Sequence, residues 1–325
     1  MKIGENATGF IKAAAGSPRV HPGEPMKNAA EICSVIDQAE ALKADVLVLP
    51  ELVLSGYTAA DLFLRAPLLE GVLTALECIK DHLKRPESEG LIVVLGAPIR
   101  ADGRLFNCAV LGIVPKSHLP NYQEFYEARW FSPASEAVSS TLELLGDTVP
   151  FGTDLIFESA SGLAIAAEIC EDLWVAQPPA TAAAAAGANV IVNLSASNET
   201  AGKAKFRREL VRLQSARSMC AYVYASSGEG ESTTDLVFSG HLLAAAGGRI
   251  AAESIWSALS SNAFAFVHLR RALRQSPAAA FMRRQRPRHA RHCGPPRWIR
   301  HPLFLKTLIA DVSAPGKFCA CSARD

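Results

Sequence analysis

The sequence predicts an α/β fold made of stacked layers of sheet and helix. Apolar runs typical of buried strands alternate with helical spacing through most of residues 8–268. Hydrophobic residues make up 49% of the 325 residues, enough for a substantial core. Three of the apolar runs end directly before a residue with a reactive side chain. A chain of this length holds one large domain or two ordinary ones.

The first half of this span reads as alternating strands and helices. Residues 46–49 (VLVL) form a continuous apolar run closed by Pro50, which predicts a strand buried on both faces. The other elements predicted here are a strand within 8–20, helices over 29–43 and 68–83, a strand over 91–97, a hairpin turn at Ala101-Asp102-Gly103 and a return strand over 105–114.

The second half continues the alternation. Residues 161–167 (SGLAIAA) predict a buried strand, and residues 178–187 (PPATAAAAAG) predict a helix with prolines at its start and glycine at its end. The remaining elements are a strand over 189–197, a long amphipathic helix over 199–220, a strand over 221–226 and a strand region over 237–252 that turns at Gly247-Gly248 and completes a second sheet.

Glu51, Lys116 and Cys170 each directly follow a strand-like run, namely DVLVLP, AVLGIVP and LAIAAEI. Each residue alone has a plain structural explanation: a strand-end charge, a surface lysine and a buried thiol. Reactive side chains gather at strand ends in α/β sheets, so the three converge if their strands are neighbours in one sheet. We favour convergence over three separate explanations.

The charge of the chain divides near residue 269. Residues 1–269 hold 20 Lys and Arg against 30 Asp and Glu, a net charge of −10, whereas residues 270–325 hold 13 against 2, a net charge of +11. No helical or strand period persists in this tail. A nucleic-acid-binding arm is one interpretation of the basic run, but we favour a disordered or frameshifted segment. His289, His292 and Cys293 lack the paired spacing of a zinc site, and we predict no metal.

The composition also indicates the cellular compartment in which the protein is expected to reside. The eight cysteines are scattered and form no CxxC pair, which suits reduced thiols in a cytoplasm better than a disulfide framework. No apolar run approaches the ~18 residues of a membrane span. The first residues lack a basic region followed by an apolar core, so we predict no secretory signal and a cytoplasmic location.

Several stretches together resemble the N-terminal, nitrilase-like glutaminase domain of glutamine-dependent NAD synthetases. These stretches are LPELVLSGYTAADL (49–62), PKSHLPNYQEFYEARWF (115–131), EICEDLW (168–174), NLSASNETAGKAKFRRELVRLQSARS (193–218) and YVYASSGEGESTTDLVFSGH (222–241). The Glu-Lys-Cys pattern is common to the whole nitrilase superfamily. The stretches 115–131 and 222–241 are more specific to the synthetase branch.

The resemblance implies a four-layer α-β-β-α sandwich over residues 1–268, followed by a basic, unpatterned tail over 269–325. It implies Glu51 as general base, Lys116 as the catalytic lysine and Cys170 as nucleophile, with Glu124 in the place of a second, supporting glutamate. It also implies L-glutamine as substrate and self-association through this domain. Residues expected around glutamine are Tyr122, Phe125, Glu171, Ser197 and Lys203, the last standing where some relatives have arginine.

The implied reaction releases ammonia through a thioester on Cys170, assisted by Glu51 and by Lys116 with the backbone N–H of Glu171. It needs no metal or organic cofactor. ATP and deamido-NAD would belong to a synthetase domain whose SGGxDS loop is not found in this sequence, which suggests a truncated or frameshifted product.

Four alternatives stay open: an amidase acting on another small amide, an inactive remnant, a nucleic-acid binder that uses the basic tail, and a cysteine–histidine hydrolase using His118 or His241 as base.

Overall fold

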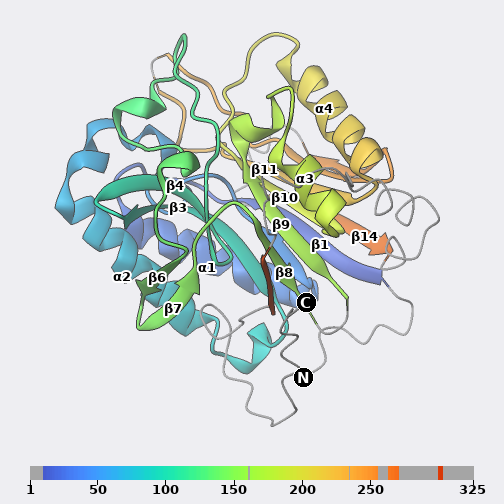
Figure 1. Cartoon of the computed structure of the whole chain (residues 1–325), viewed down its shortest axis with the longest axis horizontal. Coiled ribbons are helices and arrows are strands. Elements are labelled where there is room, and N and C mark those ends of the chain that lie inside the picture. The colour runs from blue at the N-terminus through green and yellow to red at the C-terminus, as the bar shows by residue number, and fades with distance from the viewer. Residues whose placement is uncertain (1–9, 160–161, 234, 255–262, 271–298, 303–325) are drawn as a thin grey trace, which may run out of the picture.

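The computed structural model of the chain shows two β-sheets with helices on their outer faces (Figure 1). The structure describes residues 10–159, 162–233, 235–254, 263–270 and 299–302. The order of layers is helix, sheet, sheet, helix, so the four-layer α-β-β-α prediction is confirmed.

The six-stranded sheet carries two helices on its outer face. Its strands are β1 (Phe10–Ser17), β2 (Val46–Val48), β3 (Ile92–Ala101), β4 (Arg104–Val110), β5 (Ile113–Pro115) and β14 (Ala263–Arg270), in the order β14-β1-β2-β3-β4-β5. β1, β2 and β3 are parallel. Their connections are α1 (Pro25–Ala41) and α2 (Ala66–His82), as parallel strands require. β5 again runs parallel to β2, because β4 is antiparallel to both of its neighbours.

The seven-stranded sheet is built around three parallel strands. Its strands are β8 (Leu155–Glu158), β9 (Ala164–Ile169), β10 (Val190–Ser195), β11 (Ala221–Ser226), β12 (Leu242–Ala246), β13 (Arg249–Ser254) and β15 (Ile299–Pro302), in the order β13-β12-β11-β10-β9-β8-β15. β9, β10 and β11 are parallel. α3 (Pro179–Ala186) and α4 (Lys203–Ser218) connect them and pack against this sheet.

Alternate residues of each strand face different layers, so the sandwich has three apolar interfaces. Ala13 and Ala15 of β1 pack between the two sheets with Val192 of β10, whereas Ala14 packs against the helices on its own side. In the other sheet Tyr222 and Tyr224 of β11 face α3 and α4. Strands buried on both faces have no polar side to expose, which explains their continuous apolar runs.

Proline and glycine mark the helix ends. α1 and α2 have proline in their first turn, where the missing N–H has no helical partner in any case. α3 begins at Pro179 and ends at Gly187, whose φ of 112° is the left-handed conformation that glycine adopts at low cost. α3 was predicted from this proline and glycine, whereas α1 and α2 were predicted over 29–43 and 68–83 from apolar spacing. α4 begins at Lys203 instead of Glu199.

The sequence analysis missed several short strands. β6 (Thr141–Leu144) and β7 (Asp147–Pro150) form a small antiparallel hairpin whose polar residues are partly exposed. β8 has only four residues. β14 lies at the edge of the six-stranded sheet, follows the last predicted strand region in the sequence and ends at Arg270. A four-residue strand carries too little pattern to be separated from a loop.

The predicted tail, residues 269–325, lies mostly outside the described residues. Residues 299–302 nevertheless form β15, which pairs in parallel with β8 at the edge of the seven-stranded sheet. This strand was not predicted, because a basic segment with proline has no strand period. The disorder of the remaining tail stays a prediction. Across the part of the chain that the structure describes, no helix has both the length and the apolar content to cross a bilayer.

Gly96 of β3 allows the backbone after β2 to pass unusually close. A Cβ atom at this position would lie 2.2 Å from the Leu52 nitrogen and 2.6 Å from the Pro50 oxygen. The Gly96 nitrogen donates to the Pro50 oxygen at 3.1 Å, and the Gly96 oxygen accepts from Leu54 at 3.3 Å. Gly96 therefore sets the position of the segment that carries Glu51.

Gly96→Ala should destabilise the fold by about 1–3 kcal/mol or more, because the methyl group must displace backbone atoms. Urea unfolding followed by circular dichroism measures the change. Gly71→Ala is the matched control: its Cβ would stand at ordinary contact distance, 3.4 Å from Pro25 Cγ. Alanine inside α2 should leave stability unchanged or raise it by roughly 0.5–1 kcal/mol. Equal effects of the two substitutions would contradict the close approach at Gly96.

Candidate active site

Glu51 is held by hydrogen bonds to both of its carboxylate oxygens. It follows β2 and is completely buried. Its Oε1 accepts hydrogen bonds from Lys116 Nζ at 2.6 Å and Asn107 Nδ2 at 2.7 Å, and its Oε2 accepts one from the Ala196 backbone N–H at 2.9 Å. Both carboxylate oxygens are thereby oriented by donors from three different segments.

Lys116 is also completely buried and bridges two carboxylates. Its Nζ lies 2.6 Å from Glu51 Oε1 and 2.7 Å from Glu127 Oε1. The Tyr57 hydroxyl donates to the same Glu127 oxygen at 2.8 Å. The flanking negative charges hold the pKa of Lys116 well above its usual value despite burial, so the ammonium form is retained.

Cys170 begins η5 (Cys170–Leu173), the short 3-10 helix after β9, and is buried. Its φ of 43° is left-handed, a conformation that non-glycine residues rarely adopt. Asp172 braces this turn, because its carboxylate accepts from the Ile169 N–H at 3.0 Å and from the His118 N–H at 2.9 Å. The second of these bonds links the cysteine turn to the loop that follows Lys116.

The Cys170 thiol is protonated in the resting site. Burial raises its pKa to about 12, and the negative charge of Glu51 acts in the same direction, against the opposing effect of Lys116. The Ala196 backbone N–H, which also binds Glu51, favours the thiolate to a smaller extent. A nucleophilic thiolate at this position therefore has to be produced by proton transfer.

The three strand ends meet across the two sheets and not within one. β2 and β5 belong to the six-stranded sheet, with β3 and β4 between them, whereas β9 belongs to the seven-stranded sheet. The prediction that the three strands are neighbours in one sheet is therefore wrong. Convergence occurs because the sheets pack face to face, which brings Glu51 beside Ser195 of the opposite sheet: the Glu51 nitrogen donates to the Ser195 oxygen at 3.3 Å.

A cavity of about 290 Å³ opens beside Cys170. This is near the lower end of the ~300–1,000 Å³ typical of small-molecule sites. Every residue predicted to surround the substrate lines it, as does Glu124. The lining residues are Tyr57, Pro120, Tyr122, Gln123, Glu124, Phe125, Cys170, Glu171, Trp174, Ser197, Thr200 and Lys203.

Charges of both signs surround this cavity. Lys203 Nζ lies 5.6 Å from the ring centre of Phe125 and 5.5 Å from that of Trp174, and burial lowers the pKa of this lysine. Glu171 accepts a hydrogen bond from the Tyr122 hydroxyl at 3.0 Å, and burial raises the pKa of Glu171. A ligand that carries both an ammonium and a carboxylate would find a partner for each.

Glu127 occupies the supporting position that the sequence analysis assigned to Glu124. Glu127 contacts Lys116 and is buried, and burial raises its pKa to about 7. Glu124 lies at the cavity and accepts a hydrogen bond from Asn198. The loop turns at Gln123 and Glu124: Gln123 is left-handed, and the Phe125 N–H donates to the Tyr122 oxygen at 2.9 Å.

Three further contributors to the site were also missed: Asn107, Tyr57 and the Ala196 N–H. Asn107 is the one buried amide in β4, and Tyr57 lies in the SGYTAADL segment. A polar residue within an apolar stretch was the sequence feature that could have identified both as site residues. A backbone donor such as Ala196 leaves no signal in the sequence.

Neither candidate histidine base lines this cavity. His118 Nδ1 lies 2.8 Å from Asp172 Oδ1, which raises the pKa of the ring. His241 is buried between Arg207 at 2.9 Å and Glu253 at 3.2 Å, and burial lowers its pKa. The geometry therefore supports Glu51, and not a histidine, as the base beside Cys170.

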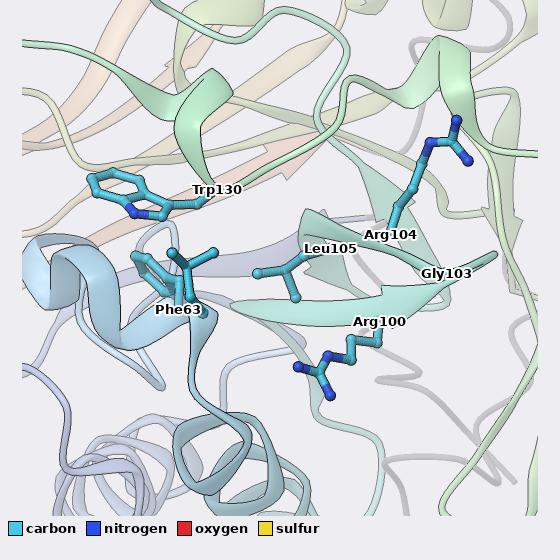
Figure 2. A pocket seen from close by; sticks show the side chains of 7 residues that line it. Phe63, Arg100, Gly103, Arg104, Leu105 and Trp130 are labelled. Atoms are coloured by element: carbon cyan, nitrogen blue, oxygen red, sulfur yellow. The ribbon is translucent and has the colours of Figure 1, made fainter.

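A second cavity of about 420 Å³ lies at the β3–β4 hairpin (Figure 2). Phe63, Trp130 and Leu105 form its apolar wall, and Arg100 and Arg104 extend from it in different directions. It is larger but contains no nucleophile or carboxylate. In the described part of the chain, no group of three or more His, Cys, Asp or Glu side chains is arranged to hold a metal ion.

The fold agrees with the comparison to known families. Residues 12–269 match the carbon-nitrogen hydrolase family, and the chain belongs to that family. The fold is shared with an amidase of Nesterenkonia AN1 that belongs to the nitrilase superfamily. An amidase from Nesterenkonia sp., 16% identical, superposes with a TM-score of 0.62 over 84% of this chain and 96% of the amidase.

Within the family, the chain is similar to glutamine-dependent NAD(+) synthetases. It is 44% identical over 258 residues to that of Mycobacterium tuberculosis, covering 76% of this chain and 37% of the relative. The crystal structure of the synthetase from Cytophaga hutchinsonii, 27% identical, superposes with a TM-score of 0.69 over 80% of this chain and 43% of that one. The chain thus spans little more than a third of the length of the curated relatives it matches.

The free enzyme should alkylate slowly at Cys170, at a rate that still rises above pH 9. A thiol with the ordinary pKa of ~8.5 would already be levelling off there. Glu51→Gln removes a charge that raises this pKa, so at fixed pH it should accelerate alkylation, by about tenfold for each unit of lowered pKa. Mass spectrometry after timed iodoacetamide treatment measures the rate, with Cys170→Ala as the blank. Slower alkylation in Glu51→Gln would contradict this prediction and would show that loss of Glu51 as a proton acceptor outweighs its effect on the pKa of the thiol.

Proposed function

We propose that this chain hydrolyses the side-chain amide of L-glutamine to glutamate and ammonia, through a thioester on Cys170. The observation that carries the proposal is one buried cluster, Glu51, Lys116 and Glu127, beside a thiol that opens on a cavity with groups of both charges. Three contributions are needed for such a reaction: proton transfer, stabilisation of the oxyanion and binding of the amino-acid head group.

Proton transfer falls to Glu51. An amide is a poor electrophile, and the resting thiol is protonated, so the nucleophile must form as the substrate binds. Glu51 accepts the proton of Cys170 as the sulfur attacks the carbonyl carbon. It then returns the proton to the leaving nitrogen, and ammonia departs. General acid–base assistance of this kind contributes about 10²–10⁴-fold.

Oxyanion stabilisation falls to Lys116, the buried cation of the cluster. As the carbonyl oxygen becomes negative, the ammonium group supplies an opposite charge inside a site that excludes water. The Glu171 backbone N–H, one residue beyond the nucleophile, is proposed as the second donor. Glu127 and Tyr57 orient the lysine from the far side.

Water completes the cycle after ammonia has left. Glu51, deprotonated again, removes a proton from a water molecule that attacks the thioester carbon. The carbon–sulfur bond then breaks, glutamate is released and the thiol is restored. The side chains that each step uses are those of Cys170, Glu51 and Lys116.

Recognition of free glutamine rests on charge complementarity at the cavity. Lys203 is the cation there and would meet the α-carboxylate, while Glu171 and Glu124 are the anions that would meet the α-ammonium group. A neutral small amide would leave all three charges without a ligand partner. This favours glutamine over the alternative of a stand-alone amidase acting on another small amide.

We further propose that the ammonia serves NAD synthesis. The support is the 44% identity to the glutamine-dependent NAD(+) synthetase of Mycobacterium tuberculosis, of which this chain spans 37%. On this proposal, residues 12–269 supply the ammonia. ATP and deamido-NAD bind to a part of the synthetase that corresponds to the unmatched length of the relatives.

Cys170→Ala should abolish glutamine hydrolysis while leaving the far-UV circular dichroism spectrum unchanged. The wild-type chain should release ammonia and take up a glutamine-derived diazo ketone on Cys170 alone, which peptide mapping by mass spectrometry would locate. Trapping at another cysteine would refute the nucleophile. A folded wild-type chain with no turnover would identify an inactive remnant instead.

Lys203→Met should raise the KM for glutamine by about tenfold or more, because a charge-assisted contact is worth roughly 1.5–3 kcal/mol. Hydrolysis of a neutral amide such as butyramide should change little. Lys203→Arg restores the charge and should recover most of the affinity. If both amides lost rate equally in Lys203→Met, the lysine would not bind the head group.

A further inference from the structure

Two cysteines outside the active site lie on the neighbouring helices α1 and α2. The two helices connect successive parallel strands on one face of the sheet and lie side by side, so they run in the same direction (Figure 1). Cys33 lies on α1 and is half-buried, whereas Cys78 lies on α2 and is exposed.

The offset in residue number between contacting positions of the two helices changes by only one residue along their length. Near their starts, a Cβ atom at Gly71 would lie 3.4 Å from Pro25 Cγ. Near their ends, His82 Nε2 lies 2.9 Å from Asp37 Oδ1. Gly71 stands 46 positions after Pro25, and His82 stands 45 after Asp37.

Just after α2, the Arg85 NH2 group contacts both Asp37 Oδ1 at 2.6 Å and Glu40 Oε2 at 3.1 Å, so the two helices stay side by side to their ends. Cys78 also stands 45 positions after Cys33. Each cysteine lies one helical turn before a residue of the Asp37–His82 contact, on the same helix edge. The register therefore directs the two thiols towards one another.

The titration of Cys33 agrees with this placement. Burial is the first cause that raises its pKa, to about 11, and the neighbouring Cys78 is the second. Two thiols influence each other in this way only when they are close. Among the described residues, both are free thiols.

We propose that Cys33 and Cys78 form a reversible disulfide that joins α1 to α2 under oxidation by a hydroperoxide. The Cys78 thiolate, on the exposed side, attacks one peroxide oxygen, breaking the O–O bond to give a sulfenic acid and, with one proton, water. The Cys33 sulfur then attacks the sulfenic sulfur, forming the S–S bond and releasing the second water. Two thiols and one hydrogen peroxide become one disulfide and two waters.

The test treats the full chain carrying Cys170→Ala with hydrogen peroxide, blocks the remaining thiols with N-ethylmaleimide and digests with trypsin without reduction. Cleavage at Lys27, Lys43, Arg65 and Lys80 separates the two cysteines into peptides 28–43 and 66–80. We expect these peptides to be joined in monomeric protein, to lose their free thiols in parallel, and to separate with dithiothreitol. Cys33→Ser should abolish the joined species.

A displaced thiol provides the matched control. In Cys78→Ala with Glu77→Cys, the sulfur moves roughly 100° around the exposed side of α2. The joined peptides should then fall at least tenfold at equal peroxide dose. The proposal would be overturned by equal amounts of joined peptides in this variant. It would also be overturned by dimers linked through Cys78, or by oxidation of Cys78 that leaves Cys33 as a free thiol.

Discussion

The buried contact of Lys116 with Glu51 and Glu127 is the constraint around which the rest of the site is arranged. Removing one cation and two carboxylates from water costs several kcal/mol for each ion, and only close pairing with further hydrogen bonds offsets that cost. Here Asn107, Tyr57 and the Ala196 N–H supply those bonds, each from a different segment. Because the Ala196 N–H directly follows β10 of the seven-stranded sheet, the full set of bonds depends on the packing of the two sheets.

This dependence explains why the site lies between the sheets. Glu51 and Lys116 follow strands of one sheet, and Cys170 follows a strand of the other. The apolar faces that hold the sheets together consist largely of small and β-branched residues, which allow close approach. Gly96 adds a local close approach behind Glu51. The packing of the two sheets therefore determines both the stability of the central interface and the alignment of the reactive groups.

Much of this could be predicted from the sequence, for reasons visible in particular residues. Long apolar runs such as VLVL before Pro50 leave little choice but a buried strand, and residues at strand ends follow directly. Glu127 could not be separated from Glu124, because their loop has no period and turns at a left-handed Gln123. The assignment of Cys170 to the opposite sheet depends on long-range pairing, which no local pattern encodes. β15 was missed because pairing with β8, and not its own composition, makes it a strand.

The charges of the cluster suggest why this arrangement suits thioester chemistry. With a protonated thiol, Glu51 and Glu127 as carboxylates and Lys116 as ammonium, the group carries one net negative charge. Transfer of the thiol proton to Glu51 moves that charge to the sulfur, and attack moves it to the carbonyl oxygen, without changing the total. As Glu51 is neutralised, Lys116 loses one of its two anionic partners at the moment when the oxyanion forms. The same ammonium that stabilises the resting Glu51 thus becomes available to the transition state, and no ion has to enter or leave the buried site.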